Sequence, residues 1–326
     1  MLVDGKWTSD WQPVQEKDQD GRFVRQVSSF RNWITPDGAP GPTGTGGFKA
    51  EAGRYRLYVA LICPWASRAL IARKLKGLDG FVDVTVVEPV LSDQGWRFGP
   101  YPGADEDPLF GAEYMHQIYT RADPRYTGRA TVPVLWDTKQ NVLVNNESAD
   151  ILRMFNSAFE ELVPGTPDLY PADLAAEIEE LNPWIYERLN NGVYKAGFAS
   201  SQLAYDEAVA GVFEVLDTLE ARLGDGRAYL LGNRLTETDI RTFVTLIRFD
   251  AAYYGLFKTN LSRIADYPGL AAYMERILHL PGVAETVSID HIKAGYYSIK
   301  ALNPSGIVPA GPASVTQMMQ SVAASA

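Results

Sequence analysis

One residue of the chain has both the side chain and the setting of a nucleophile: Cys63, the only cysteine, which Pro64 follows at once. Residues 55–61 alternate as a strand does, and residues 66–75 carry apolar side chains at helical spacing. Cys63 is therefore predicted at the start of a helix, where backbone N–H groups and the helix dipole favour a thiolate. The alternative is a small apolar residue packed under the sheet, but the strand–cysteine–proline–helix order favours a nucleophile.

Two residue pairs further along the chain could hold a peptide-like ligand. Val132-Pro133 lies inside the apolar stretch 131–137, where a trans proline would disrupt a strand ladder. We therefore predict a cis bond that exposes the Val132 backbone, with an edge-strand proline as the alternative. Glu147-Ser148 is predicted at a helix start, where it offers a carboxylate to an ammonium group and a hydroxyl with N–H groups to a carboxylate. Alone the pair would be a helix cap; with the cysteine and the proline it suits a γ-glutamyl group.

The composition argues against several kinds of binding site. A single cysteine excludes an internal disulfide and a cysteine-rich zinc site, and the three histidines lie far apart, so no metal is expected. Gly44-Thr45-Gly46 lacks the third glycine of a phosphate-binding loop, because Lys49 stands there, and no nucleotide is expected.

Net charge and hydropathy indicate which kinds of binding partner to expect. Forty Asp and Glu against 30 Lys and Arg give a formal net charge of −10, which argues against nucleic acid or an anionic membrane as the main partner. The apolar stretches are far shorter than the roughly 18 residues of a membrane helix. The first residues lack the apolar core of a signal peptide. We therefore expect no membrane association and a cytoplasmic location.

The first half of the chain divides into two segments. Residues 1–53 are rich in Gly, Pro, Asp and Thr without a sustained period, which predicts an extended arm. Residues 54–160 have the pattern of a small α/β domain. Its expected elements are a β-α-β unit over 55–87, strands at 131–137 and 141–144 joined by a hairpin turn, and a helix over 149–159.

The second half shows no strand pattern. Residues 172–310 contain long amphipathic segments and are predicted to form an all-helical domain. Thr236 and Asp239 have the spacing of a capping box at the start of one of these helices, with Asp in place of the usual Glu. Residues 311–326 have the composition of a flexible tail. The expected fold class is thus α/β followed by all-α.

The chain resembles the glutathione transferase superfamily, which has a thioredoxin-like domain followed by an all-helical domain. In its details it resembles the Xi class, the glutathionyl-hydroquinone reductases, from about Gly5 to Pro312. The most specific motifs are Cys63-Pro64-Trp65-Ala66, Gly95-Trp96-Arg97-Phe98, the stretch 128–137, the stretch 192–199, Arg248-Phe249-Asp250 with Tyr253, Asn303-Pro304 and the stretch 307–312. The arm with Phe30-Arg31 also fits and is not typical of other classes.

This resemblance implies a two-step thiol reaction with glutathione as co-substrate. The Cys63 thiolate would attack the sulfur of a glutathionyl-hydroquinone, releasing the hydroquinone and leaving a Cys63–glutathione mixed disulfide. A second glutathione would then release oxidised glutathione. An aryl carbanion is a very poor leaving group, so the ring must react as a keto tautomer or be protonated at carbon, with phenolic donors assisting.

The resemblance also assigns roles to named residues. Tyr194, Tyr253 and Tyr296 would line the aromatic substrate pocket and supply the donors, although core packing is the alternative for each tyrosine. Glutathione would be held by Trp96, Arg129, Val132, Pro133, Glu147 and Ser148, with the arginine suited to the glycyl carboxylate.

The sequence departs from the family pattern at two places. Ser67 stands where the family usually has His after Cys-Pro-Trp-Ala, which could alter the rate or the pH optimum. Ala294-Gly295 replaces a basic residue and His before Tyr296, which affects the preferred ring substituents.

Two other functions share some of these features. One is an Omega-like thioltransferase or dehydroascorbate reductase, which also uses a cysteine but needs neither the three tyrosines nor the arm. The other is a non-catalytic protein that binds glutathione or an aromatic ligand, although such a protein does not need a thiolate. A conjugating transferase is disfavoured, because Cys63 would form a disulfide with glutathione. The resemblance also implies a homodimer.

Overall fold

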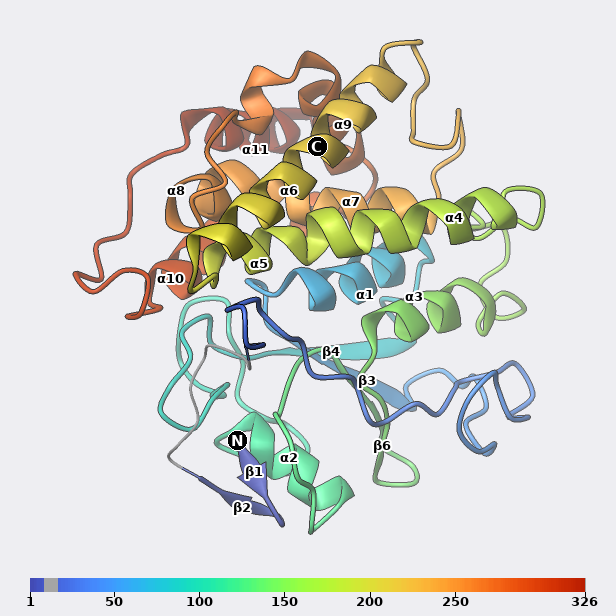
Figure 1. Ribbon diagram of the computed structural model, residues 1–326. Helices are drawn as coiled ribbons and strands as arrows, with labels where there is room; N and C mark the ends of the chain where they lie inside the picture. The colour runs from blue at the N-terminus through green and yellow to red at the C-terminus, as the bar shows by residue number, and fades with distance from the viewer. Residues whose placement is uncertain (9–16, 326) are drawn as a thin grey trace. The chain divides into compact units, whose positions relative to one another are not determined.

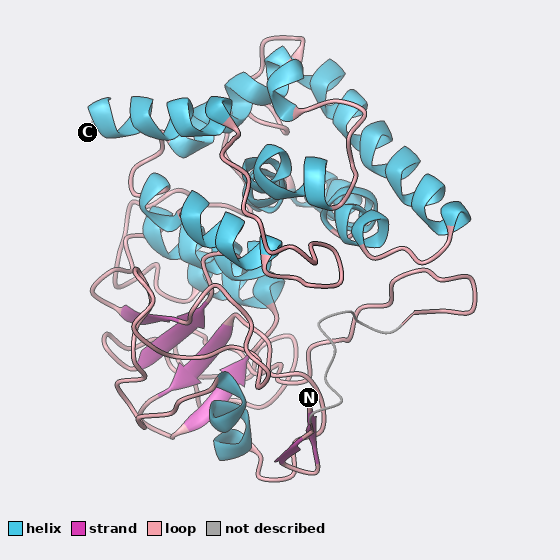
Figure 2. Cartoon of the chain, turned by 90° about the vertical axis from the view of Figure 1, so that its left-hand side faces the viewer, coloured by secondary structure: helices cyan, strands magenta, loops and turns pink. Residues whose placement is uncertain are grey.

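The computed structural model describes residues 1–8 and 17–325, and it divides into two compact units (Figures 1 and 2). The first unit contains residues 1–8 and 26–167, and the second contains residues 17–25 and 168–325. The sheet strands lie in the first unit, whereas regular structure in the second is helical. The fold is therefore the expected one, a thioredoxin-like α/β domain followed by an all-helical domain.

A four-stranded mixed sheet forms the centre of the first unit, in the order β4-β3-β5-β6. Its strands are β3 (Tyr55–Val59), β4 (Val82–Val86), β5 (Val134–Asp137) and β6 (Val142–Asn145). β3 pairs with β4 in parallel and with β5 antiparallel, and β5 pairs with β6 antiparallel. The predicted β-α-β unit and hairpin are thus confirmed. β5 begins three residues later than expected, beyond Pro133, whose nitrogen cannot donate to a ladder.

Helices cover this sheet. They are α1 (Pro64–Leu75), α2 (Met115–Ala122) and α3 (Ser148–Ser157). α1 packs against α3, and Figure 1 shows both on one face of the sheet with α2 on the other. The sequence analysis anticipated α1 and α3 but not α2, which lies in the long connection between β4 and β5.

The arm that we predicted over residues 1–53 is bound to the folded units along much of its described length. Strands β1 (Leu2–Val3) and β2 (Lys6–Trp7) form a small hairpin, and the Leu2 backbone bonds to Gly128. Residues 30–32 lie along β6: the Asn32 N–H donates to the Val144 carbonyl at 3.0 Å, and the Asn146 N–H donates to the Phe30 carbonyl at 3.1 Å. Backbone pairing fixes the path of this segment without any side-chain period.

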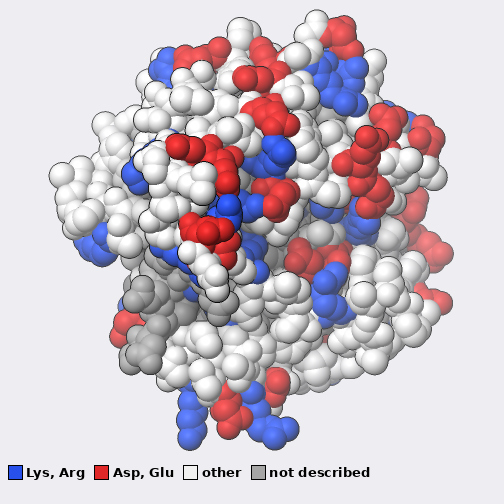
Figure 3. Space-filling model, viewed as in Figure 1, with Lys and Arg blue, Asp and Glu red and all other residues white. Residues whose placement is uncertain are grey.

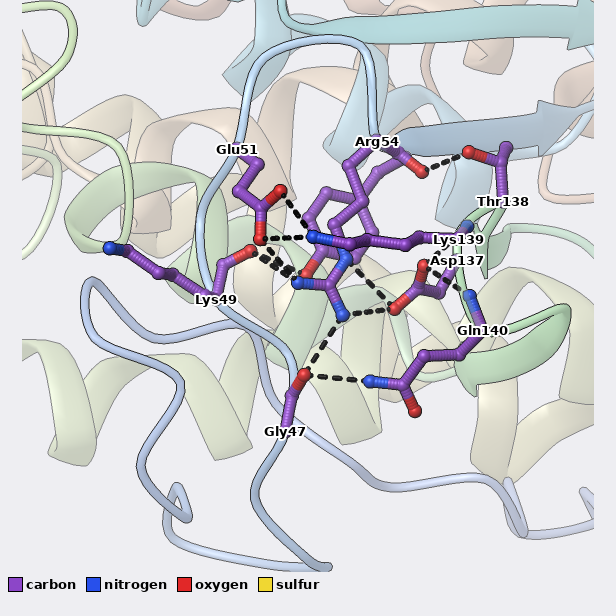
Figure 4. A network of polar contacts seen from close by, with 9 residues as sticks. Gly47, Lys49, Glu51, Arg54, Asp137, Thr138, Lys139 and Gln140 are labelled. Carbon is purple, nitrogen blue, oxygen red and sulfur yellow. Dashed lines mark hydrogen bonds and ion pairs between the residues drawn. The ribbon is translucent and has the colours of Figure 1, made fainter.

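An ion-pair network joins the end of the arm to the sheet (Figure 4). The Arg54 guanidinium makes two bonds to Asp137 Oδ2, at 3.0 and 2.6 Å, and one to Glu51 Oε1 at 2.9 Å. It also donates to the Gly47 carbonyl at 2.8 Å. Asp137 is fully buried and Arg54 is 6% exposed, so the carboxylate depends on this arginine for charge compensation.

The second unit is built from packed helices, some of them consecutive in the sequence and some far apart in it. Its α-helices are α4 (Ala175–Ile185), α5 (Gly192–Gly197), α6 (Gln202–Leu223), α7 (Glu237–Arg248), α8 (Tyr254–Leu256), α9 (Pro268–Leu278), α10 (Ile289–Tyr297) and α11 (Ala313–Ser325). Wider π-helical turns, η1 (Tyr186–Asn190) and η2 (Phe249–Tyr253), continue α4 and α7. The helix pairs α5–α6, α6–α9 and α4–α7 form its interior.

The capping box predicted at the start of α7 is present. The Thr236 N–H donates to Asp239 Oδ2 at 2.8 Å, and burial raises the pKa of this carboxyl. The segment expected as a flexible tail over 311–326 contains α11 instead. Its Ala, Met and Gln residues are good helix formers, and the buried Val315 packs it against the unit.

Charge is dispersed on the face shown in Figure 3, where acidic and basic side chains alternate. Among the described helices, none is long and apolar enough to cross a membrane. Within the described residues, no group of three or more His, Cys, Asp or Glu could hold a metal ion.

Candidate active site

The thiol lies at the helix start that the sequence predicts. Cys63 is the N-cap of α1, with extended backbone (φ −75°, ψ 116°), and Pro64 occupies the first helical position. The residue is partly exposed and its thiol is not in a disulfide. Its carbonyl accepts two bonds from Ser67, from the N–H and from Oγ, each at 3.1 Å. The Ser67 hydroxyl therefore binds the backbone of the cysteine.

Val132 lies beside this thiol. The Cys63 Sγ donates to the Val132 carbonyl oxygen at 3.5 Å. The Val132-Pro133 peptide bond is cis, as predicted, and both residues are buried at the start of β5. A cysteine on α1 and a backbone segment 69 residues later thus lie in contact.

Glu147 and Ser148 open α3, also as predicted. Glu147 rather than Ser148 is the N-cap: its Oε1 accepts the Ala149 N–H at 3.1 Å. Ser148 is the first helical residue, is buried, and donates from Oγ to Glu147 Oε1 at 3.4 Å. One carboxylate, one hydroxyl and the first N–H groups of a helix are therefore gathered at this point.

Two further candidates for holding glutathione lie in loops of the same unit. Trp96 is partly exposed in the connection between β4 and α2, where its carbonyl accepts the Met115 N–H at 2.9 Å. Arg129 lies shortly before β5 and is partly exposed; its backbone N–H donates to Gln26 Oε1 at 3.2 Å.

In the second unit, the three predicted tyrosines meet. Tyr194 lies on α5, Tyr253 at the end of η2 and Tyr296 on α10. The hydroxyls of Tyr194 and Tyr296 are 2.5 Å apart, and those of Tyr253 and Tyr296 are 2.8 Å apart. Tyr296 therefore bonds to both of the others, Tyr194 also interacts with Tyr253, and residues from three helices form one connected chain of hydroxyls.

Burial determines the protonation state of two of these three hydroxyls. Tyr253 and Tyr296 are buried, and burial first, then the neighbouring phenols, raises the pKa of each well above its usual 10. Both therefore keep their protons at neutral pH. If Tyr253 donates to Tyr296 and Tyr296 donates to Tyr194, the partly exposed Tyr194 can direct its own proton away from the other two.

Aromatic and cationic neighbours of this cluster were not anticipated. The Tyr194 ring lies 5.4 Å from Phe257, 6.3 Å from Phe23 and 6.4 Å from Phe198. The Arg25 guanidinium lies 4.9 Å from the Tyr194 ring centroid. Phe198 follows Tyr194 by one helical turn, a spacing that could have indicated it; Phe23 and Arg25 lie in the arm, where no pattern connects them to α5.

The two substitutions before Tyr296 remove polar side chains from α10. Ala294 is partly exposed and Gly295 is buried, and neither contributes a donor or a charge beside the tyrosine hydroxyls. The described polar groups of the cluster include the phenols themselves, the Arg25 guanidinium and the buried Arg248, whose positive charge acts to lower the pKa of the two buried phenols.

Family models match a segment in each unit of the chain, and known proteins match most of its length. Residues 62–158 match the family model of the glutathione S-transferase N-terminal domain, and residues 202–276 match that of the C-terminal domain. The chain is 55% identical over 314 residues to glutathionyl-hydroquinone reductase YqjG of Escherichia coli, covering 96% of this chain and 95% of that protein. It is 46% identical to glutathionyl-hydroquinone reductase PcpF of Sphingobium chlorophenolicum, covering 96% of each.

Solved structures give the same result. The glutathione-bound structure of YqjG superposes with a TM-score of 0.88 at 52% identity, covering 96% of this chain and 95% of that one. The glutathione S-transferase Xi of Phanerochaete chrysosporium gives a TM-score of 0.87 at 48% identity, covering 92% and 98%. With its N-capping cysteine and its tyrosine cluster, the chain belongs to the glutathionyl-hydroquinone reductases, the Xi class of the glutathione transferase superfamily.

Proposed function

We propose that this protein reduces glutathionyl-hydroquinones to hydroquinones, using Cys63 as nucleophile and glutathione as co-substrate. The observation that carries the proposal is the partly exposed thiol at the N-cap of α1, next to the Val132 carbonyl. The helix start favours the thiolate, and the neighbouring backbone offers a peptide-like ligand a partner. A conjugating transferase or a passive binding protein would have no use for this thiol.

In the first step the Cys63 thiolate attacks the sulfur that joins glutathione to the ring. The new S–S bond forms as the S–C bond breaks. With the ring in a keto tautomer, the electron pair of that bond moves into the adjacent carbonyl and gives the phenolate of the hydroquinone. A phenolic donor supplies the proton that completes the hydroquinone.

In the second step a glutathione thiolate attacks the glutathione sulfur of the mixed disulfide. Oxidised glutathione leaves, and the electron pair of the broken S–S bond returns to Cys63 as the thiolate. The sulfurs of two glutathiones are thereby oxidised to the disulfide. The ring keeps the two electrons of the broken C–S bond and gains one net proton, which comes from the thiol of the second glutathione, so that C–H replaces the thioether. No metal or nucleotide is needed for this balance.

We assign the binding of glutathione to groups of the first unit. The Val132 backbone, next to Pro133, would pair with the cysteinyl part. Glu147 would hold the ammonium of the γ-glutamyl group, and Ser148 with its helix-start N–H groups would hold the carboxylate. Trp96 and Arg129 would hold the remainder, with the guanidinium paired to the glycyl carboxylate.

We assign the ring to the tyrosine cluster of the second unit. Tyr194 is the proton donor, because it is the partly exposed end of the hydroxyl chain. We assign Tyr296 as donor to Tyr194 and Tyr253 as donor to Tyr296, because burial keeps both of these phenols protonated. A chain of this kind strengthens its terminal donor, since each hydrogen bond polarises the next.

We also propose a homodimer that works in the cytoplasm, as the family resemblance implies. Light scattering coupled to size-exclusion chromatography tests the dimer, with twice the 36.0 kDa chain mass as the expected result. Fractionation of the source cells tests the location.

The decisive experiment is reduction of glutathionyl-menadiol with excess glutathione, comparing the wild type with Cys63→Ser. Intact-mass analysis follows the protein during turnover. Turnover by the wild type, its loss in the variant, and a transient adduct of one glutathione are expected. Reduction of dehydroascorbate or mixed disulfides instead would favour an Omega-like thioltransferase. Binding of glutathione without turnover of any of these would favour a binding protein.

A further inference from the structure

The arm segment of residues 26–31 contacts the residues to which we assign glutathione binding, and no part of the proposed chemistry explains why. Figure 1 shows the arm in blue beside β6. Gln26 Oε1 accepts the Arg129 N–H at 3.2 Å. The Phe30 N–H donates to Asn146 Oδ1 at 3.1 Å. The segment thus follows the loop that leads from β6 into α3.

Within this segment Ser28 binds the N-cap carboxylate directly. Its hydroxyl lies 3.0 Å from Glu147 Oε2 and 3.2 Å from the Asn146 carbonyl, so its single proton is shared between two acceptors. The other carboxylate oxygen, Oε1, is held by the Ala149 N–H. Glu147 is therefore fixed at both oxygens, and its rotation about the last side-chain bond is restricted. A carboxylate oriented in this way loses less entropy when it binds an ammonium group.

Arg31 neutralises the negative charge of Asp150 in the first turn of the same helix. Its guanidinium makes two bonds to Asp150, Nε to Oδ2 at 2.5 Å and Nη2 to Oδ1 at 2.9 Å. Asp150 is the third residue of α3 and is 7% exposed. Asn145 Nδ2 donates to the same carboxylate at 3.1 Å. Without the arginine, a buried negative charge would stand in the first turn of the helix and oppose a carboxylate bound there.

We propose that Ser28 and Arg31 are positioning residues that set the affinity of this protein for the γ-glutamyl end of glutathione. Ser28 orients Glu147 for the ammonium, and Arg31 neutralises Asp150 so that the carboxylate can bind at the start of α3. The inference rests on the proposed function only in taking glutathione as the ligand of this helix start.

The test measures binding of S-methylglutathione, which cannot form a disulfide, by calorimetry to the full chain. Ser28→Ala is expected to raise the Kd about fivefold, the effect of one hydrogen bond of ordinary net strength. Arg31→Gln is expected to raise it about tenfold, and Arg31→Lys to recover part of the loss, because lysine keeps the charge. Thr35→Val is the matched control: its hydroxyl donates to the Ala39 carbonyl, within the arm and outside the contacts above.

A kinetic measurement separates positioning from simple destabilisation. In the reductase assay, the KM for glutathione should rise in Ser28→Ala and Arg31→Gln while kcat at saturating glutathione stays within about twofold. A Kd within twofold of the wild type for both variants overturns the inference, as does equal weakening by Thr35→Val. Normal binding of S-methylglutathione by a wild type that reduces no glutathionyl-hydroquinone would instead refute the proposed function alone.

Discussion

The hydroxyl chain of the second unit makes an unequal prediction for its members. Tyr296→Phe removes two hydrogen bonds, at 2.5 and 2.8 Å, whereas Tyr253→Phe removes the 2.8 Å bond and a weaker contact with Tyr194. At about 1 kcal/mol for each net hydrogen bond, the two changes should lower the free energy of unfolding by about 2 and about 1 kcal/mol. With a urea dependence of about 2.5 kcal/mol/M, these are midpoint shifts of about 0.8 and 0.4 M.

Equilibrium urea unfolding followed by far-UV circular dichroism measures both shifts. Tyr205→Phe is the control, because it removes one partly exposed hydroxyl that donates to the Lys258 carbonyl. The reductase assay ranks the variants by kcat. Tyr194→Phe should lower kcat about 100-fold, because it removes the proton donor, and Tyr296→Phe should lower it about tenfold. Equal midpoint shifts for Tyr296→Phe and Tyr253→Phe would refute the central place of Tyr296 in the chain. A larger loss of kcat for Tyr253→Phe than for Tyr194→Phe would refute the direction assigned to it.

Three further predictions concern stability. Arg54→Met should destabilise the first unit by about 3–5 kcal/mol, because it leaves Asp137 buried without its cation; an unchanged urea midpoint would contradict this. Burial, then the positive N-terminus, lowers the pKa of His116 from 6.5, so its contribution to stability is present above about pH 6.5 and lost as the pH falls. His116→Gln should therefore show a smaller loss of Tm between pH 7 and pH 5 than the wild type, and an equal loss would exclude this histidine as a cause. Thr236→Ala should cost about 1 kcal/mol, because it removes the hydroxyl that bonds to Asp239; a cost below 0.3 kcal/mol would mean that the cap is dispensable.

The β-α-β unit could be predicted because its signals are local. The alternating residues before Cys63, the proline after it and the apolar spacing beyond all lie within about one strand and one helix of each other. The structure agrees from Tyr55 to Val86 with shifts of one or two residues. The same reasoning predicted the capping box of α7, which spans the four residues from Thr236 to Asp239.

The features that the sequence analysis missed depend on backbone pairing between distant segments, or are helices with a weak sequence pattern. The arm pairs with β6 by backbone bonds at residues 30–32, which any side chains could make. α2 is only eight residues long, and α11 was obscured by a composition that also suits a tail. Ser28 has no sequence signal at all, because its partner Glu147 lies 119 residues away.

The tyrosines show why family resemblance and structure were both needed. With 17 tyrosines in the chain, periodicity cannot select three that meet, and core packing accounts for any one of them. Tyr194 and Tyr296 are 102 residues apart, on different helices. Their convergence carries a physical cost, because two phenols are buried where ionisation is strongly disfavoured. That cost is offset when each buried phenol donates a hydrogen bond to the next tyrosine. The partly exposed Tyr194 is then the last donor of the chain. A cluster that served only for packing would gain more from phenylalanine, as the neighbouring Phe257 illustrates, and the three connected hydroxyls therefore support the proton donation that we propose.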